Sequence, residues 1–384
     1  MKIKRVAILG STGSIGRQAL EVIDSTPGLS VCALAAGGNW ELLAEQARKF
    51  RPQVVAIADG RNHSELRSCL GSGVEVLTGP DAMTELVRRS RPDILLTALV
   101  GSAGLAPTLA GIECGADLAI ANKETLVMAG AVVMPAARAA GVAVLPVDSE
   151  HSAIFQCLAA GKRSEVRRVI ITASGGALRD WAADRAESAT VAEALNHPTW
   201  QMGPKITVDS ATLINKALEI VEAHWFFDLP ADEIAVVLHE QSIVHSLVEY
   251  CDGSVIAQMG RPDMTGPIAY ALCHPHRRAR GGAPLDLAAV GTLTFRRVEG
   301  RFARAVELGF EAIRRGGTAG AVLNSANEAA VAAFLAGKIR FGRIVPLVEE
   351  ILNRAPRGPR NVTLEALVEA DAWARRCVSA AIDG

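Results

Sequence analysis

The chain has 384 residues, which is too long for one hydrophobic core and predicts two or three domains. Hydrophobic residues make up 49% of it and charged residues 21%, which excludes a largely disordered protein. The 40 basic and 41 acidic residues leave a formal net charge of -1, so the composition indicates no nucleic-acid partner and no anionic membrane surface.

The remaining bulk features favour a cytoplasmic protein. The seven cysteines are widely spaced, form no CxxC pair and are odd in number, as expected for a reducing compartment. The N-terminal segment enters a strand without a signal-peptide pattern. The longest uncharged stretch, 94–112, is interrupted by Gly101, Gly104 and Pro107, so we expect a strand, a loop and a helix start there and no membrane span.

Up to about residue 146, short apolar strands alternate with amphipathic helical segments. The expected strands are 5–9, 30–35, 54–57, 94–98, 118–121 and 142–147. Short, fully apolar strands separated by helices are typical of a parallel sheet covered on both faces.

A second α/β region follows, and its expected strands are 168–172, 234–238, 246–250 and 255–258. Beyond about residue 300 four amphipathic segments predict a small all-helical domain. The predicted organisation is therefore an α/β protein with an N-terminal domain at 1–148, a central α/β domain at 149–274, a linker at 275–300 and a C-terminal helical domain at 301–384.

A glycine-rich turn follows the first strand and opens a helix. Gly10, Gly13 and Gly16 would permit a tight turn and a close backbone approach to a pyrophosphate at the helix N-terminus. The spacing is GxxGxxG rather than the usual GxGxxG, and such turns also occur for purely steric reasons. Its position in a βαβ unit favours dinucleotide binding and a Rossmann-like N-terminal domain.

The end of the second strand carries no acidic residue. The run is Ala35-Ala36-Gly37-Gly38-Asn39, whereas an NAD enzyme typically places Asp or Glu there to bond the ribose hydroxyls. A carboxylate would repel a 2′-phosphate, so its absence favours NADP(H). An ordinary glycine turn is the alternative explanation.

Two carboxylates, Asp148 and Glu150, end an apolar strand. In extended chain, residues two apart point the same way, so the two groups are expected to converge. They would repel unless a proton or cation lies between them, and Mg²⁺ or Mn²⁺ suits an all-oxygen site. A solvated loop with a helix N-cap, near Ser149 and Ser152, explains this segment equally well.

A second polar cluster runs from a loop into a helix, with Asp209 or Ser210 as the expected cap. A capped helix start presents N–H groups and a positive dipole end to a phosphate. Asn215 lies one helical turn before Glu219, and Lys216 lies beside both.

This second cluster predicts a phosphate cradle whose glutamate, Glu219, completes a carboxylate triad. The alternative is an exposed helix with a Lys–Glu pair. Glu222, one turn further on, is a rival metal ligand.

Two further loops are candidates for substrate contact. Ser174-Gly175-Gly176 follows a strand and offers a backbone-rich anion loop. The segment near 194–204 carries His197 and Trp200 between prolines and glycines, which indicates a flap that excludes water. Simple surface packing of Trp200 is the alternative.

Together these segments resemble the 1-deoxy-D-xylulose 5-phosphate reductoisomerase family of the non-mevalonate isoprenoid pathway, over nearly the whole chain. The order and spacing of several motifs carry the resemblance. They are GSTGSIG from Gly10, ANKE from Ala121, PVDSEHSAIFQ from Pro146, SGG from Ser174, HPTWQMGPKITVDSATLINKALE from His197, QSIVHS from Gln241 and LNSANEAAVAAFL from Leu323.

The resemblance implies a homodimer that uses NADPH and Mg²⁺ or Mn²⁺ to convert this sugar phosphate into 2-C-methyl-D-erythritol 4-phosphate. It implies NADPH contacts at Thr12, Gly13, Ser14, Ile15, Gly37, Asn39, Asn122, Lys123, Glu124 and Gly203. It implies metal ligands at Asp148, Glu150 and Glu219. It implies substrate contacts at Ser149, Ser174, His197, Trp200, Met202, Ser210, Asn215 and Lys216. Catalytic roles are predicted for Ser149, Glu150, His197 and Lys216.

The chain departs from the family pattern at a few positions. Gly38 stands where Lys is frequent, which removes one contact to the 2′-phosphate. The other departures are Ala177, Leu178, Ala217 and Glu240. Rival functions are a plain NADP-dependent dehydrogenase, a metal-dependent aldolase or isomerase with a vestigial nucleotide domain, and a non-catalytic NADPH sensor.

Overall fold

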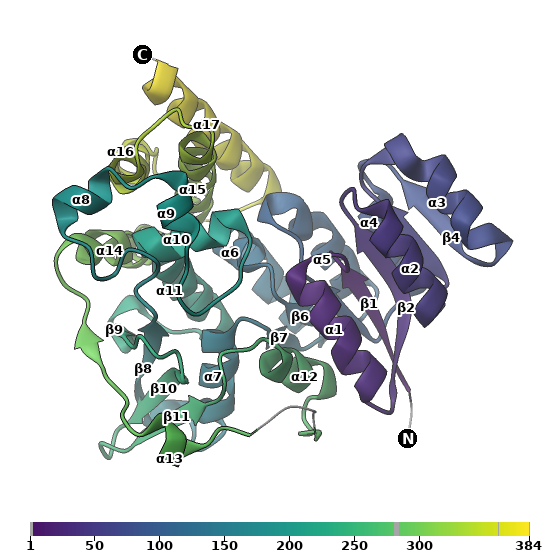
Figure 1. The fold of residues 1–384 in the computed structure, drawn as a ribbon, viewed down its shortest axis with the longest axis horizontal. Coiled ribbons are helices and arrows are strands. Elements are labelled where there is room, and N and C mark those ends of the chain that lie inside the picture. The colour runs from purple at the N-terminus through teal and green to yellow at the C-terminus, as the bar shows by residue number, and fades with distance from the viewer. Residues whose placement is uncertain (1–2, 280–283, 360, 384) are drawn as a thin grey trace. The chain divides into compact units, whose positions relative to one another are not determined.

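The computed structural model describes residues 3–279, 284–359 and 361–383 and divides into two compact units (Figure 1). The first unit runs to Thr125 and also includes Val133–Ser152 and the segment that begins at Asp263. The second holds Leu126–Val132, Ala153–Pro262 and the segment from Pro284 onward. Residues 280–283 of the predicted linker lie outside the described residues.

The first unit is built on a seven-stranded sheet in the order β4-β3-β2-β1-β5-β6-β7, with neighbouring strands parallel. Its strands are β1 (Lys4–Leu9), β2 (Leu29–Ala36), β3 (Val54–Ile57), β4 (Glu75–Thr78), β5 (Ile94–Thr97), β6 (Asp117–Ile120) and β7 (Val144–Pro146). The interior strands are apolar because helices cover both faces of the sheet. The predicted parallel sheet is therefore confirmed.

The chain moves outward from β1 to β4, returns to β5 beside β1, and then continues to β7. Because βαβ connections are right-handed, the helices of these two halves lie on opposite faces of the sheet. The helices of this unit are α1 (Ser14–Ser25), α2 (Trp40–Phe50), α3 (His63–Leu70), α4 (Ala82–Ser90), α5 (Leu105–Glu113), α12 (Thr265–Cys273) and part of α6 (Lys123–Ala140). The switch point, where open α/β sheets bind ligands, lies at the ends of the neighbouring strands β1 and β5.

The second unit contains a mixed sheet in the order β11-β10-β8-β9-β12. Strand β8 pairs with β9 in parallel, and the other neighbouring strands in this order are antiparallel. The strands are β8 (Val166–Ala173), β9 (Ile234–Leu238), β10 (Val244–Tyr250), β11 (Val255–Met259) and β12 (Arg296–Arg297). The first four were predicted from apolar patterning, whereas β12 lies in the stretch predicted as a linker.

Helices pack on this sheet and on one another through a shared core. They are α8 (Ala183–Glu187), α9 (Val191–Leu195), α10 (Pro204–Thr212), α11 (Ile214–Phe227), α14 (Arg301–Arg315), α15 (Ala319–Leu335), α16 (Ile344–Arg354) and α17 (Leu364–Asp383), whereas the short α13 (Leu287–Val290) buries no residue. Val169 of β8, Leu218 of α11, Leu308 of α14 and Leu347 of α16 belong to one fully buried cluster. The C-terminal helices therefore stabilise the helix that carries the predicted phosphate cradle.

The predicted domain bounds at 148, 274 and 300 stay a prediction, because the second compact unit contains parts of all three later segments. Among the helices in the described part of the chain, none is both long and apolar enough to cross a bilayer.

Candidate active site

The glycine-rich turn lies at the switch point of the parallel sheet. Gly10 follows β1 with φ +86°, and a Cβ added to it would lie 2.3 Å from the Ala98 carbonyl oxygen beyond β5. A Cβ on Gly16 would lie 2.3 Å from the Gly10 oxygen, so α1 starts directly against the turn. Gly13 is the N-cap of α1 and offers no side chain to the first N–H groups. The turn has the form that a pyrophosphate requires.

The ends of β2 and β3 lie next to this turn in the sheet. Gly37 has no atom of another residue near the place of a Cβ. Asn39, predicted to contact NADPH, is the N-cap of α2, where its Oδ1 accepts from the Leu42 N–H at 3.2 Å. Asp59, which follows β3, donates its N–H to the Gly37 oxygen at 2.8 Å. Sequence reasoning missed this acidic neighbour because it considered only the end of β2.

Three buried polar residues, Asn122, Lys123 and Glu124, follow β6. The Asn122 amide donates to the Leu99 oxygen at 2.9 Å and to Glu124 Oε2 at 2.7 Å, so it ties the end of β6 to the loop after β5. Lys123 Nζ lies 2.8 Å from Asp148 Oδ2. The segment predicted to contact the nicotinamide is thereby joined to the first predicted metal ligand.

Asp148 and Glu150 lie where β7 passes into α7 (Ser149–Leu158). The predicted convergence of the two carboxylates is confirmed, since their oxygens come within 4.8 Å of one another. The predicted reason was wrong, because Glu150 lies in a helix that begins at Ser149 and not in extended chain. The Ser149 N–H donates to Asp148 Oδ1 at 3.1 Å, and its hydroxyl donates to Glu150 Oε2 at 2.5 Å. The serine thus links the two carboxylates. The N-cap considered near Ser149 and Ser152 is not found, because both serines lie inside α7.

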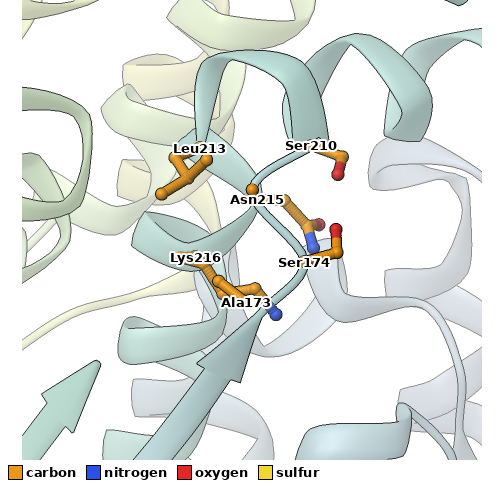
Figure 2. Close-up of a pocket in the computed structure, with 7 residues that line it drawn as sticks. Ala173, Ser174, Ser210, Leu213, Asn215 and Lys216 are labelled. Carbon is orange, nitrogen blue, oxygen red and sulfur yellow. The ribbon is translucent and has the colours of Figure 1, made fainter. Parts of the chain in front are cut away.

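A pocket lies between the end of β8 and the junction of α10 and α11. It is a small hollow that is partly open to solvent. Figure 2 shows the hydroxyls of Ser174 and Ser210 and the amide of Asn215 gathered on one side. Lys216 also lines the pocket. The four residues predicted to hold the phosphate therefore lie together.

The local structure that forms this pocket is not the predicted helix cap. Asp209 and Ser210 lie inside α10, and neither caps α11. The break between the helices is at Leu213, which has a left-handed backbone with φ +64°. This turn is what brings Ser210 and Asn215 to one pocket, and a hydrophobic residue at such a φ is not predicted from sequence.

Glu219 is fully buried on α11 and is held by its own helix. It accepts from the Asn215 amide at 2.5 Å and from Lys216 Nζ at 2.6 Å. The predicted alignment of Asn215, Lys216 and Glu219 is confirmed, but this face of the helix is buried and not exposed. Glu222, the rival ligand, is fully buried as well.

The flap segment is anchored to the pocket through His197. The ring Nδ1 accepts from the N–H groups of Thr199, at 3.1 Å, and Trp200, at 2.9 Å. The proton therefore resides on Nε2, which lies 3.0 Å from Ser174 Oγ. Burial, and then the positive charge of Arg179, lower the pKa of His197 to about 4. The imidazole is thus a neutral hydrogen-bond donor at physiological pH.

The other predicted flap residues lie nearby in the chain. The Trp200 ring is 6.4 Å from the His245 ring between centroids. Met202 precedes Gly203, which is the N-cap of α10. Gly203 has no atom near the place of a Cβ, which is compatible with its predicted contact to a cofactor.

A parallel sheet with a glycine-rich turn at its switch point defines the class of dinucleotide-binding α/β proteins. Sequence models of three consecutive domains match this chain: 1-deoxy-D-xylulose 5-phosphate reductoisomerase at residues 6–130, its C-terminal domain at 144–227, and the DXP reductoisomerase C-terminal domain at 259–377. The chain belongs to the 1-deoxy-D-xylulose 5-phosphate reductoisomerase family.

Individual relatives agree with this assignment. The 1-deoxy-D-xylulose 5-phosphate reductoisomerase of Gloeobacter violaceus is 50% identical over 380 residues, which cover 98% of this chain and 97% of the relative. The enzyme of a Geobacillus species is 48% identical, with 98% and 99% covered.

Solved structures agree as well. The crystal structure of DOX-P reductoisomerase in complex with NADPH, fosmidomycin and magnesium has a TM-score of 0.92 at 39% identity, with 99% of this chain and 98% of that chain covered. The Zymomonas mobilis enzyme in complex with NADPH also has a TM-score of 0.92, at 40% identity, and both chains are covered in full.

Proposed function

We propose that this protein converts 1-deoxy-D-xylulose 5-phosphate, NADPH and a proton into 2-C-methyl-D-erythritol 4-phosphate and NADP⁺. Membership of the reductoisomerase family along nearly the whole chain carries the proposal. The carbon skeleton of the ketone is first rearranged to an isomeric branched aldehyde. A hydride then adds to the aldehyde carbon, and its oxygen takes up a proton to give the alcohol.

The residues present fit both cofactors. The tight turn of Gly10, Gly13 and Gly16, in which a side chain at Gly10 or Gly16 would collide with the backbone, fits the pyrophosphate of NADPH. Asp148, Glu150 and Glu219 offer only carboxylate oxygens, the donors that Mg²⁺ and Mn²⁺ prefer. When bound, NADPH supplies the hydride and the divalent ion supplies positive charge at the ketone and hydroxyl oxygens of the substrate.

The pocket of Ser174, Ser210, Asn215 and Lys216 holds the phosphate end of the substrate. Two hydroxyls, an amide and an ammonium group can each donate to a phosphate oxygen. The neutral His197 donates to Ser174 Oγ, which leaves the serine hydroxyl proton to point at the phosphate. Binding energy gained there orients the reacting end of the substrate.

The reacting end lies toward Ser149, Glu150 and Lys216 in this proposal. Lys216 is fixed by its 2.6 Å ion pair with Glu219, so its position beside a metal ligand is set before substrate binds. The Ser149 hydroxyl, bonded to Glu150, hydrogen-bonds the substrate oxygens. Trp200 and Met202 close over the substrate as the flap and exclude water.

The remaining parts of the proposal concern the working state. We expect Asn122, Lys123 and Glu124 to border the nicotinamide, with Gly203 contacting the cofactor from the flap. We expect either Mg²⁺ or Mn²⁺ to support the reaction. We also expect the chain to act as a homodimer and the enzyme to work in the cytoplasm.

Product analysis tests the function. Purified protein is incubated with 1-deoxy-D-xylulose 5-phosphate, NADPH carrying deuterium at the transferred position, and Mg²⁺. NMR is expected to show the branched polyol phosphate with one deuterium on a new CH₂OH carbon. A deuterated but unbranched alcohol would identify a plain reductase and refute the reductoisomerase assignment.

A further inference from the structure

The loop after β3 reaches the end of β2 and supplies the side chains that β2 lacks there. The backbone ladder continues beyond the paired residues, since the N–H of Ala58 donates to the Ala36 oxygen at 3.0 Å and that of Asp59 to the Gly37 oxygen at 2.8 Å. A Cβ placed on Gly38 would lie 3.7 Å from Asp59 Oδ2. The carboxylate of Asp59 therefore occupies the space beside Gly38.

Arg61 holds this carboxylate in a fixed geometry. Its Nε lies 2.9 Å from Asp59 Oδ1 and its Nη2 lies 2.5 Å from Oδ2, while its backbone N–H donates to Oδ1 at 3.2 Å. These hydrogen bonds lower the pKa of Asp59 to about 2. The side chain of Arg61 is 87% exposed and that of Asp59 29%. The pair is thus a preformed ion pair, in which Asp59 fixes the orientation of the more exposed Arg61 guanidinium.

The position of this pair in the fold indicates which part of the cofactor it contacts. In a doubly wound sheet with the pyrophosphate at the turn after β1, the end of β2 faces the adenosine ribose. An acid there selects the 2′-hydroxyl of NAD, and an arginine accommodates the 2′-phosphate of NADP. This chain provides both groups from the adjacent strand, and the arginine is the more exposed of the two.

We propose that Arg61, oriented by Asp59, binds the 2′-phosphate of NADPH and sets the preference of this enzyme for NADPH over NADH. Guanidinium has five N–H donors, and the bonds to Asp59 use Nε and Nη2. None of the hydrogen bonds that Arg61 makes within the described part of the chain uses Nη1. This nitrogen can therefore donate to a phosphate. This inference rests on the proposed use of NADPH.

Removing Arg61 is expected to do more than lower the affinity for NADPH. Without its partner, Asp59 presents an unneutralised carboxylate to the ribose. That carboxylate repels a 2′-phosphate but accepts from a 2′-hydroxyl. Arg61→Ala is therefore expected to act in opposite directions on the two cofactors.

The test measures binding by titration calorimetry, without substrate or metal, for NADPH, NADH and 2′,5′-ADP. Arg61→Ala is expected to weaken NADPH and 2′,5′-ADP by roughly 10- to 100-fold, the scale of a lost charge-assisted hydrogen bond, and to leave NADH equal or tighter. Arg61→Lys is expected to recover part of the NADPH affinity. Arg67→Ala, on the neighbouring α3, is the matched control and is expected to change neither cofactor.

Unchanged NADPH affinity in Arg61→Ala would overturn the proposal. Equal weakening of NADPH and NADH would also overturn it, since it would assign Arg61 a structural role. Failure of the unmodified protein to bind either cofactor would instead refute the proposed function, and this inference with it.

Discussion

At the scale of single residues, α11 carries two buried glutamates, Glu219 and Glu222, and only one of them lies among the proposed substrate contacts. Glu219→Gln is expected to keep the fold, because an amide can still accept from Asn215 and Lys216. It should lower kcat by about 100-fold or more, since it removes a charge that holds the ion stabilising the developing negative charge. Turnover measured against Mg²⁺ concentration checks this.

Glu222→Gln is the matched variant for this test, as it lies on the same helix and is equally buried. A loss of Mg²⁺-dependent turnover in Glu222→Gln with near-normal activity in Glu219→Gln would move the third metal ligand to Glu222. Circular dichroism of both variants shows whether either change disturbs the helix.

His197 gives a prediction about pH. Its pKa in the fold is about 4, against an ordinary value of 6.5, so the unfolded chain binds more protons between these values. The contribution of His197 to stability is therefore present above pH 6.5 and is lost as the pH falls toward 4. NMR titration of the imidazole is expected to show a neutral ring at pH 5.5, with the proton on Nε2.

A midpoint near 6.5 in that titration would contradict the geometry of the flap anchor. His197→Asn supplies the control on stability. If His197 is responsible, the melting temperature of this variant should fall less between pH 7 and pH 5 than that of the unmodified protein.

At the scale of elements, the glycines that shape the cofactor site separate into two kinds. Gly10→Ala forces a side chain to φ +86° and against the Ala98 oxygen, so it should destabilise the protein and weaken NADPH binding together. Gly37 has open space and no positive φ. Gly37→Ala should leave the melting temperature unchanged and weaken NADPH only, because its methyl group would enter the space for the cofactor.

Both measurements are made on the same samples by thermal melting and by NADPH titration. A Gly37→Ala variant that binds NADPH normally would show that the backbone at the end of β2 does not approach the cofactor.

The junction between α10 and α15 is held by a buried charge. Asp209 is fully buried, lies 2.8 Å from Lys205 Nζ, and accepts from the Asn327 amide at 2.8 Å. Asn327→Ala removes a hydrogen bond to a charged group and is expected to lower the free energy of unfolding by about 2 kcal/mol. Because α10 carries Ser210, the KM for the sugar phosphate should rise while NADPH affinity stays unchanged.

Asn324→Ala is the control, since this buried amide on the same helix donates to Glu328 of α15 at 3.1 Å. It should lower stability without raising the KM. Equal KM values in the two variants would show that the hydrogen bond between Asn327 of α15 and Asp209 of α10 does not affect the phosphate pocket.

Several elements were predictable because their signal is local. Strands β3 and β9 have the bounds expected from their apolar runs. Strand β4, with the sequence EVLT, was missed because it is a partly exposed edge strand without an apolar pattern. Glu150 was wrongly expected in extended chain, because periodicity does not show where a strand ends and a helix begins.

At the scale of the whole molecule, the sequence led to the residues of the phosphate pocket but not to how they meet. Ser174 and Lys216 are 42 positions apart in the chain, and their proximity depends on the left-handed turn at Leu213. The Asp59–Arg61 pair was missed for a related reason. Its importance comes from the pairing of β3 with β2, which the separate strand patterns do not specify.

In the proposed reaction, one chain couples metal-dependent rearrangement to reduction by NADPH. The most direct test is NADPH oxidation by the purified protein with 1-deoxy-D-xylulose 5-phosphate, first with Mg²⁺, then with excess chelator, and then with Mg²⁺ restored. We expect oxidation that needs the sugar phosphate, stops with the chelator and returns with the ion. Oxidation that continues unchanged in the chelator, or its absence in a folded sample that binds NADPH, would contradict this expectation.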